Sequence, residues 1–211
     1  MIGAARAPAA MPKRSLHASV LEATTRYPGR LAVHDGARSL DYAALRQRAA
    51  VAALHLMRTG VQRGDRVAVF AERSVDTIVT ILAVLMNGAA YVPIDPRWPP
   101  SRKRYVLDTI SARAVVVAGA DLTEAAADYA CGSRFVSFER LADEADPSEL
   151  QLTAQVEASD IAYILFTSGS SGRPKGVMVS HAAALHFAAW AAECFGIAPD
   201  DRIAGVSSFT F

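Results

Sequence analysis

Residues 161–181 read Ile-Ala-Tyr-Ile-Leu-Phe-Thr-Ser-Gly-Ser-Ser-Gly-Arg-Pro-Lys-Gly-Val-Met-Val-Ser-His, and the rest of the chain is organised around this stretch. Its first six residues are apolar or aromatic, which predicts a buried strand. That strand stops at a block of hydroxyl residues and glycines, which have no bulky side chains. A second short apolar run follows at residues 177–179. The pattern therefore predicts a small-residue loop between two strands.

The composition of this loop suits the binding of an anion. Gly169 and Gly172 allow backbone angles that other residues avoid, so that successive N–H groups can converge on one point. Lys175 supplies a mobile positive charge suited to phosphate oxygens. The pattern is not a Walker A motif, because Pro174 stands where that motif has its second glycine. A generic Ser/Gly segment is a solvated turn, but the preceding strand and the following Pro-Lys-Gly favour phosphate binding. The predicted binding residues are Thr167, Ser168, Gly169, Ser170, Ser171, Gly172, Lys175 and Gly176.

Composition excludes several other classes of protein. The net charge of +1 argues against a dedicated nucleic-acid binder, which would carry a basic stripe. The longest apolar stretch, residues 78–86, is about half of the ~20 residues that a bilayer span requires, so no membrane association is expected. Cys131 and Cys194 lie far apart without ligand-type neighbours, which indicates free thiols in a reducing cytoplasm. Residues 1–14 read as a disordered leader, with a transit peptide as the alternative.

The remaining chain alternates between strand and helix patterns, which predicts βαβ units and a mostly parallel sheet flanked by helices. Residues 31–40 are typical of a small hairpin. Lone His17 and His34 are expected to be structural or solvent-facing, His181 to start a helix, and Trp190 to lie in the core or in a substrate-pocket wall. The predicted strands are 66–70, 91–94, 114–117, 135–136 and 203–206, and the predicted helices are 15–27, 41–59, 74–87, 102–110, 121–129 and 181–195. Residues 143–159 read as a surface connection.

Three motifs resemble those of the adenylate-forming (AMP-binding) superfamily. Residues 167–176 are similar to its phosphate-binding signature, with Ser171 where threonine is commoner. Residues 40–45, Leu-Asp-Tyr-Ala-Ala-Leu, resemble the first core motif, from which Asp41 and Ala44 depart. Residues 85–95, Leu-Met-Asn-Gly-Ala-Ala-Tyr-Val-Pro-Ile-Asp, resemble the second motif. The continuation Asp-Pro-Arg-Trp-Pro is in the style of amino-acid-activating domains, so residues 15–211 resemble the N-terminal part of a nonribosomal peptide synthetase adenylation domain.

The resemblance implies a two-step reaction. A substrate carboxylate attacks the α-phosphate of Mg·ATP, pyrophosphate leaves, and a phosphopantetheine thiol on a carrier-protein domain then takes the acyl group. The loop hydroxyls would donate to the β- and γ-phosphates, and Lys175 would neutralise the departing pyrophosphate. The implied fold is an incomplete N-terminal large subdomain, cut before the fourth core motif, which residues 206–211 begin. The regions that bind adenine, ribose and Mg²⁺ and the family's catalytic lysine would lie outside the 211 residues, so this chain alone is expected to be inactive.

Two alternatives stay open at the level of sequence. One is an aryl- or acyl-CoA synthetase fragment of the same superfamily. The other is a natural truncated nucleotide-binding or interaction module, or half of a split enzyme. Because residues 203–211 are expected to form an unpaired apolar edge, the chain by itself is predicted to fold poorly and to aggregate.

Overall fold

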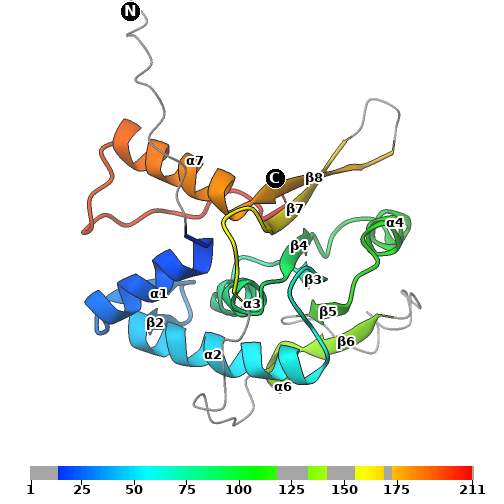
Figure 1. Cartoon of the computed structure of the whole chain (residues 1–211), viewed down its shortest axis with the longest axis horizontal. Coiled ribbons are helices and arrows are strands. Elements are labelled where there is room, and N and C mark those ends of the chain that lie inside the picture. The colour runs from blue at the N-terminus through cyan, green and yellow to red at the C-terminus, as the bar shows by residue number, and fades with distance from the viewer. Residues whose placement is uncertain (1–13, 118–132, 142–154, 169–172, 211) are drawn as a thin grey trace, which may run out of the picture.

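The computed structural model describes residues 14–117, 133–141, 155–168 and 173–210. Its described elements form an α/β arrangement in which helices pack on both faces of one mixed sheet (Figure 1). This is the fold class that the sequence predicts. Two further predictions, the helix at 121–129 and most of the surface connection, lie outside the described residues, as do residues 1–13. Arg14, at the end of the expected leader, pairs with Glu22.

The N-terminal layer is built from two helices and a hairpin. Helix α1 (Leu16–Arg26) precedes the antiparallel strands β1 (Leu31–His34) and β2 (Ser39–Asp41), as predicted. Helix α2 (Tyr42–Arg58) follows directly. Its N-cap is Asp41, whose carboxylate accepts a hydrogen bond from the backbone N–H of Ala44 at 2.7 Å. This bond satisfies one of the free N–H groups of the first turn, which explains why the helix starts there.

The central sheet has six strands in the order β6-β5-β3-β4-β7-β8. Its strands are β3 (Arg66–Phe70), β4 (Ala90–Ile94), β5 (Ala114–Val117), β6 (Arg134–Ser137), β7 (Ile161–Thr167) and β8 (Lys175–Ser180). All neighbouring pairs are parallel except β7 and β8, which are antiparallel. Between the strands run α3 (Val75–Met86), α4 (Pro100–Ile110) and the short α6 (Phe138–Leu141).

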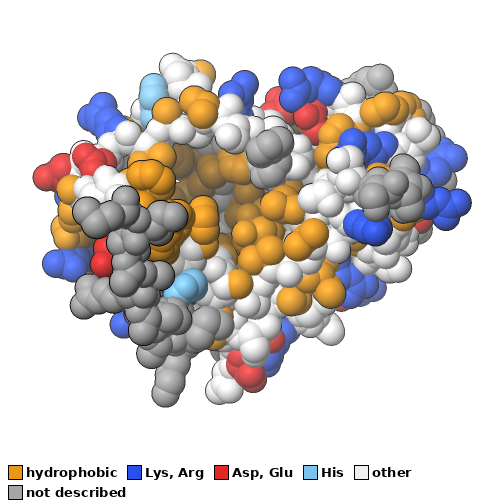
Figure 2. Space-filling model, turned by 90° about the horizontal axis from the view of Figure 1, so that it is seen from above, with side chains coloured by type: hydrophobic (Ala, Val, Ile, Leu, Met, Phe, Trp, Pro, Cys, Tyr) orange, Lys and Arg blue, Asp and Glu red, His pale blue; other side chains and the backbone are white. Residues whose placement is uncertain are grey.

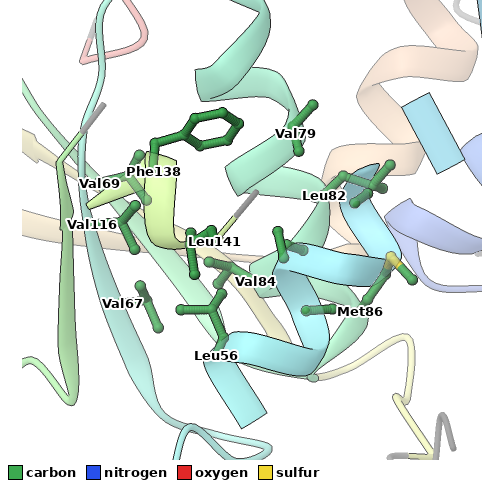
Figure 3. Close-up of a cluster of buried hydrophobic side chains, with 14 of the residues drawn as sticks. Leu56, Val67, Val69, Val79, Leu82, Val84, Met86, Val116, Phe138 and Leu141 are labelled. Atoms are coloured by element: carbon green, nitrogen blue, oxygen red, sulfur yellow. The ribbon is translucent and has the colours of Figure 1, made fainter. Parts of the chain in front are cut away.

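Strand β3 separates two hydrophobic cores. Val67 and Val69 face α2, α3 and α6, whereas Ala68 and Phe70 face α4 and β7. Successive side chains of a strand point to opposite faces, so one valine-rich run serves both cores. Figure 3 shows the first core, in which Leu56 of α2 and Val84 of α3 meet the sheet residues. The apolar runs over 67–70, which Arg66 precedes, and over 114–117 therefore indicate these two strands, and the predicted strands 66–70 and 114–117 have the observed bounds.

Two predictions near the C-terminal end are wrong. Residues 203–206 form no strand, because no neighbouring strand in the described part of the chain offers them hydrogen bonds; Ile203 and Val206 are each 75% exposed. Trp190 lies on α7 (His181–Cys194) and is 52% exposed, so the predicted core position is wrong, whereas a place in a substrate-pocket wall stays a prediction. Figure 2, a view from the α7 side, shows hydrophobic side chains gathered on this face. Among the described residues, no helix has the length and hydropathy to span a membrane.

Candidate phosphate-binding hairpin

The candidate site is the hairpin of β7 and β8, which extends from the edge of the sheet (Figure 1). In β7 the apolar side chains alternate between buried and half-buried positions until Phe166, and the strand then ends in the exposed Thr167. Strand β8 begins at Lys175, two residues before the apolar run that the sequence shows. The register pairs Thr167 directly with Lys175. The hairpin thus places a hydroxyl and an ammonium group opposite each other at the mouth of the loop.

The predicted site residues divide into three groups. Thr167 and Ser168 are exposed at the carboxyl end of β7, and Lys175 and Gly176 are exposed at the start of β8. These four are brought together by the hairpin. The remaining four, residues 169–172, lie outside the described residues. Within the described part of the chain Lys175 forms no ion pair with a carboxylate, and its side chain is exposed.

Gly176 has a packing role that the sequence does not reveal. It pairs with Phe166 across the hairpin. A Cβ atom added at position 176 would lie 3.1 Å from Ile164 Cγ2 and 3.2 Å from Phe166 Cζ, closer than most Cβ contacts. Glycine therefore lets the Phe166 ring lie against the neighbouring strand. This contact lies one residue pair before Thr167 and Lys175.

The base of the hairpin is anchored by aromatic and charged contacts. Tyr163 of β7 pairs with Tyr91 of β4, and their ring centroids are 5.4 Å apart. Burial raises the pKa of both phenols. Just before β7, the Asp160 carboxylate accepts hydrogen bonds from Arg63 at 2.8 and 2.9 Å, and these bonds are the main cause that lowers the pKa of Asp160. Both contacts tie the hairpin to the parallel sheet.

A separate cavity of about 560 Å³ lies at the amino ends of the strands. Its lining includes Arg63, Arg66 and Met178, but neither Thr167 nor Lys175. The two arginines are already engaged, Arg63 with Asp160 and Arg66 with the carbonyl oxygen of Ile110. In open α/β sheets ligands bind outside the carboxyl ends of the strands. We therefore assign the candidate site to the loop end of the hairpin and not to this cavity.

The residue after β8, His181, is placed by features far apart in the sequence. Ser180 caps α7 by accepting the Ala183 N–H at 3.2 Å, as predicted. His181 is fully buried and contacts His17 of α1. The sequence predicts that His17 is structural or solvent-facing and that His181 starts a helix, but no local signal indicates that the two residues meet. Cys194 is an exposed free thiol, and Cys131 lies outside the described residues. No cluster of three or more metal-ligating side chains occurs in the part that the structure describes.

Comparison with known families identifies the class of protein. Residues 20–211 match the family described as AMP-binding enzyme. The chain belongs to this family.

Within the family, the chain matches the N-terminal portion of nonribosomal peptide synthetase adenylation domains. It is 38% identical over 207 residues to pyochelin synthetase PchF of Pseudomonas aeruginosa, covering 97% of this chain and 11% of that protein. It is 35% identical over 202 residues to the L-proline--[L-prolyl-carrier protein] ligase of Pseudomonas fluorescens, covering 93% of this chain and 41% of the ligase. The chain thus spans only part of the length of the relatives it matches.

Solved structures agree with this assignment. The nonribosomal peptide synthetase FmoA3, in its alpha-methyl-L-serine-AMP-bound form, superposes with a TM-score of 0.87 at 26% identity, covering 96% of this chain and 22% of FmoA3. Apo MatB from Rhodopseudomonas palustris superposes with a TM-score of 0.83 at 27% identity, covering 94% of this chain and 41% of MatB. The described fold is therefore the N-terminal part of the adenylate-forming enzyme fold.

Proposed function

We propose that this chain supplies the phosphate-binding part of an amino-acid-activating adenylation domain. In the proposed reaction an amino-acid carboxylate attacks the α-phosphate of ATP and pyrophosphate leaves. The aminoacyl group then passes from the adenylate to the phosphopantetheine thiol of a carrier domain, and AMP is released. The observation that carries the proposal is the hairpin register, which sets Thr167 opposite Lys175 at the mouth of a Ser/Gly loop.

The proposed roles follow from charge and geometry. Phosphoryl transfer mainly requires positioning and neutralisation of negative charge. The hydroxyls of Thr167 and Ser168, with those of Ser170 and Ser171, would donate to the β- and γ-phosphate oxygens. Lys175 would neutralise the pyrophosphate as it leaves. The exposed hydroxyls and ammonium group beside the loop fit a polyphosphate. Mg²⁺ would add further charge neutralisation; we assign none of its ligands to this chain.

The names of similar proteins support an amino acid as the acid that is activated. The relatives include a prolyl-carrier-protein ligase and peptide synthetases such as bacitracin synthase 1 of Bacillus licheniformis. The FmoA3 structure holds an amino-acid adenylate. The test is amino-acid-dependent ATP–pyrophosphate exchange by the intact native polypeptide, measured with a panel of amino acids. Exchange with none of them would contradict the proposal.

The variant Lys175→Ala tests the role of the hairpin lysine. Removing a charge that neutralises the leaving pyrophosphate should reduce the exchange rate by about 10- to 100-fold. Arg48→Ala is the matched control, because it removes the same charge from an exposed position on α2. An unchanged rate in Lys175→Ala, with the variant correctly folded, would remove Lys175 from the site.

A second candidate function is activation of a different carboxylic acid by the same chemistry. It is favoured by the similarity to the N-terminal subdomain of Klebsiella oxytoca NpsA, whose complex with 3-hydroxybenzoyl-AMSN superposes with a TM-score of 0.69 at 26% identity. Aryl and acyl acids in the same exchange assay distinguish this reading from amino-acid activation. Exchange with an aryl or acyl acid and with no amino acid would favour it.

The intact mass of the native polypeptide is the measurement to make first. A mass well above 22.4 kDa would place the 211 residues within a larger synthetase. A mass equal to it would favour a truncated module or half of a split enzyme. ATP binding by the 211-residue chain alone distinguishes a nucleotide-binding module from an incomplete part of an enzyme. A micromolar Kd, which corresponds to a binding free energy of about 8 kcal/mol, would indicate a self-sufficient nucleotide site.

A further inference from the structure

Two buried histidines join the start of α1 to the start of α7. His17 is the second residue of α1 and is 8% exposed, and His181 is the first residue of α7 and is 0% exposed. Their rings meet edge to face, with centroids 5.9 Å apart. Histidine is the side chain whose charge changes between about pH 5 and 8. A buried pair of histidines is therefore a group whose packing depends on pH.

The hydrogen bonds require His181 to be neutral. The backbone N–H of Leu16 donates to His181 Nδ1 at 3.0 Å, so Nδ1 must keep its lone pair and the proton must be on Nε2. Among the described residues, His181 Nε2 and His17 Nδ1 are both buried without a hydrogen-bond partner. His17 Nε2 lies 3.3 Å from the Ser15 hydroxyl oxygen. An imidazolium ion donates from both ring nitrogens, and within the described part of the chain neither ring has an acceptor at both of its nitrogens.

The surrounding elements offer little charge compensation. The carboxylate of Asp160 favours the charged form of His181, but this carboxylate is already bound to Arg63. On α3 the charged residue is Asp76, which binds Arg38. The other acidic, basic and histidine residues on the packed helices are Arg14, Glu22 and Arg26 near and on α1, Arg46, Arg48, His55 and Arg58 on α2, and His186 and Glu193 on α7. The remaining ionisable groups on the packed elements are Tyr42 on α2, Cys194 on α7, Tyr163 on β7 and Lys175 on β8. Arg14 and Glu22 pair with each other, and the three α2 arginines are exposed.

We propose that His17 and His181 form a pH-sensitive clasp, which holds α1 on the start of α7 while both rings are neutral and releases α1 when either ring is protonated. Protonation of His181 at Nδ1 removes the acceptor for the Leu16 N–H. Protonation of both rings places two cations in contact in a buried site. Because α7 follows directly after β8, the clasp also connects α1 to the candidate phosphate-binding hairpin.

The direction of the pH effect follows from burial. Desolvation lowers the pKa of His17 to about 4, helped by the charge of His181, and desolvation also lowers the pKa of His181. A released histidine has a pKa of about 6.5. The docked state therefore binds fewer protons than the released state. The equilibrium constant for docking of α1 on the start of α7 is therefore highest above about pH 6.5. It falls as the pH is lowered from there towards 4, by up to about tenfold per pH unit for each histidine.

Hydrogen exchange of the full chain, corrected for the intrinsic pH dependence of exchange, tests the clasp. Between about pH 7.5 and 5.5, protection of residues 16–26 should fall at least tenfold, while protection of residues 75–86 in α3 stays unchanged. In the double variant His17→Gln and His181→Asn, protection of residues 16–26 should lose this pH dependence. The introduced glutamine would offer an amide near the former Nε2 of His17, and the introduced asparagine an acceptor near the former Nδ1 of His181. Neither amide can be protonated in this pH range.

The control variant is His34→Gln, which removes an exposed histidine and should keep the wild-type pH dependence. If residues 16–26 and 75–86 lose protection together, or if the double variant keeps the full pH effect, the clasp is refuted. Should the double variant fail to fold, histidine NMR titration of the wild-type chain decides. Titration of both rings below about pH 5.5 supports the clasp, and titration near the ordinary pKa of about 6.5 overturns it.

Discussion

Helices α3 and α7 have the same local signals and opposite environments. Each begins after a serine whose hydroxyl accepts a backbone N–H from the first turn, and each is followed closely by a glycine with positive φ, +69° at Gly88 and +62° at Gly196. Nine of the twelve residues of α3 are buried, but only three of the fourteen residues of α7. The caps and glycines therefore specify where a helix begins and ends, whereas packing specifies how much of the helix is buried.

The difference arises from what lies against each helix. Helix α3 lies between α2 and the sheet and fills one hydrophobic core (Figures 1 and 3). Helix α7 lies beyond the edge strand β8, with Phe187 and Trp190 65% and 52% exposed. Their ring centroids are 5.7 Å apart. Large exposed apolar patches commonly mark contact surfaces or aggregation sites. We therefore expect changes on the exposed face of α7 to affect association, and changes in α3 to affect folding stability.

The strongest test of this comparison is a core truncation in α3. Leu82→Ala should lower the free energy of unfolding by about 2–5 kcal/mol, because it removes buried methyl groups and leaves a cavity. Phe187→Ala on α7 is the matched change and should cost far less, since most of that ring already contacts solvent. Urea unfolding at constant m-value measures both. Equal losses of unfolding free energy in the two variants would contradict the distinction between the buried helix α3 and the exposed helix α7.

Substitutions of the glycines that follow the two helices should have effects of intermediate size on stability. Alanine at either position is strained by about 1–2 kcal/mol, because φ is positive. At Gly88 a Cβ would also lie 3.1 Å from Arg63 Cγ and 3.2 Å from Val156 Cγ2, whereas at Gly196 nothing lies within 4 Å. Gly88→Ala should therefore reduce the thermal midpoint more than Gly196→Ala. Equal reductions would mean that movement of the Arg63 side chain relieves the crowding at Gly88, and the reverse order would contradict the prediction.

The smallest expected effect on stability is that of a substitution on the exposed face of α7 that carries Phe187 and Trp190. Trp190→Ala should change the free energy of unfolding by no more than about 0.5 kcal/mol, because the ring is half exposed. The same variant should reduce self-association of the 211-residue chain, as measured by sedimentation velocity over a range of concentrations. Leu31→Ala, at an exposed residue of β1, serves as control. Unchanged self-association in Trp190→Ala would exclude this face as its cause.

The sequence predicted most of the fold because its local signals agree with one another. The bounds of β3 and β5 follow from uninterrupted apolar runs, since parallel strands are covered on both faces. Asp41 and the capping serines mark helix starts through side-chain hydrogen bonds that need no distant partner. The same reasoning wrongly placed a strand at 203–206, because an apolar run forms a strand only where a neighbour supplies hydrogen bonds. It also placed Trp190 inside, because periodicity gives no information on what covers a helix face.

For the candidate site too, the local elements were predictable from the sequence, and the contacts between them were not. The sequence predicted two strands joined by a small-residue loop, whereas the register that pairs Thr167 with Lys175 is visible only in the structure. The close contact of Gly176 with Phe166 depends on side-chain packing across the strands. The binding roles of the loop residues stay a prediction, which the pyrophosphate-exchange experiment tests.

The sequence by itself determined the family, most of the described strands and helices, the helix caps and the location of the Ser/Gly-rich loop. These depend on residues near one another in the chain or on motifs that can be read directly. Tertiary structure alone decided which apolar helix is buried and that His17 meets His181. It also decided that the arginine–aspartate pair at the base of the hairpin forms. Such contacts join segments more than ninety residues apart, as the separation of 97 between Arg63 and Asp160 shows, and local physical signals carry no information about them.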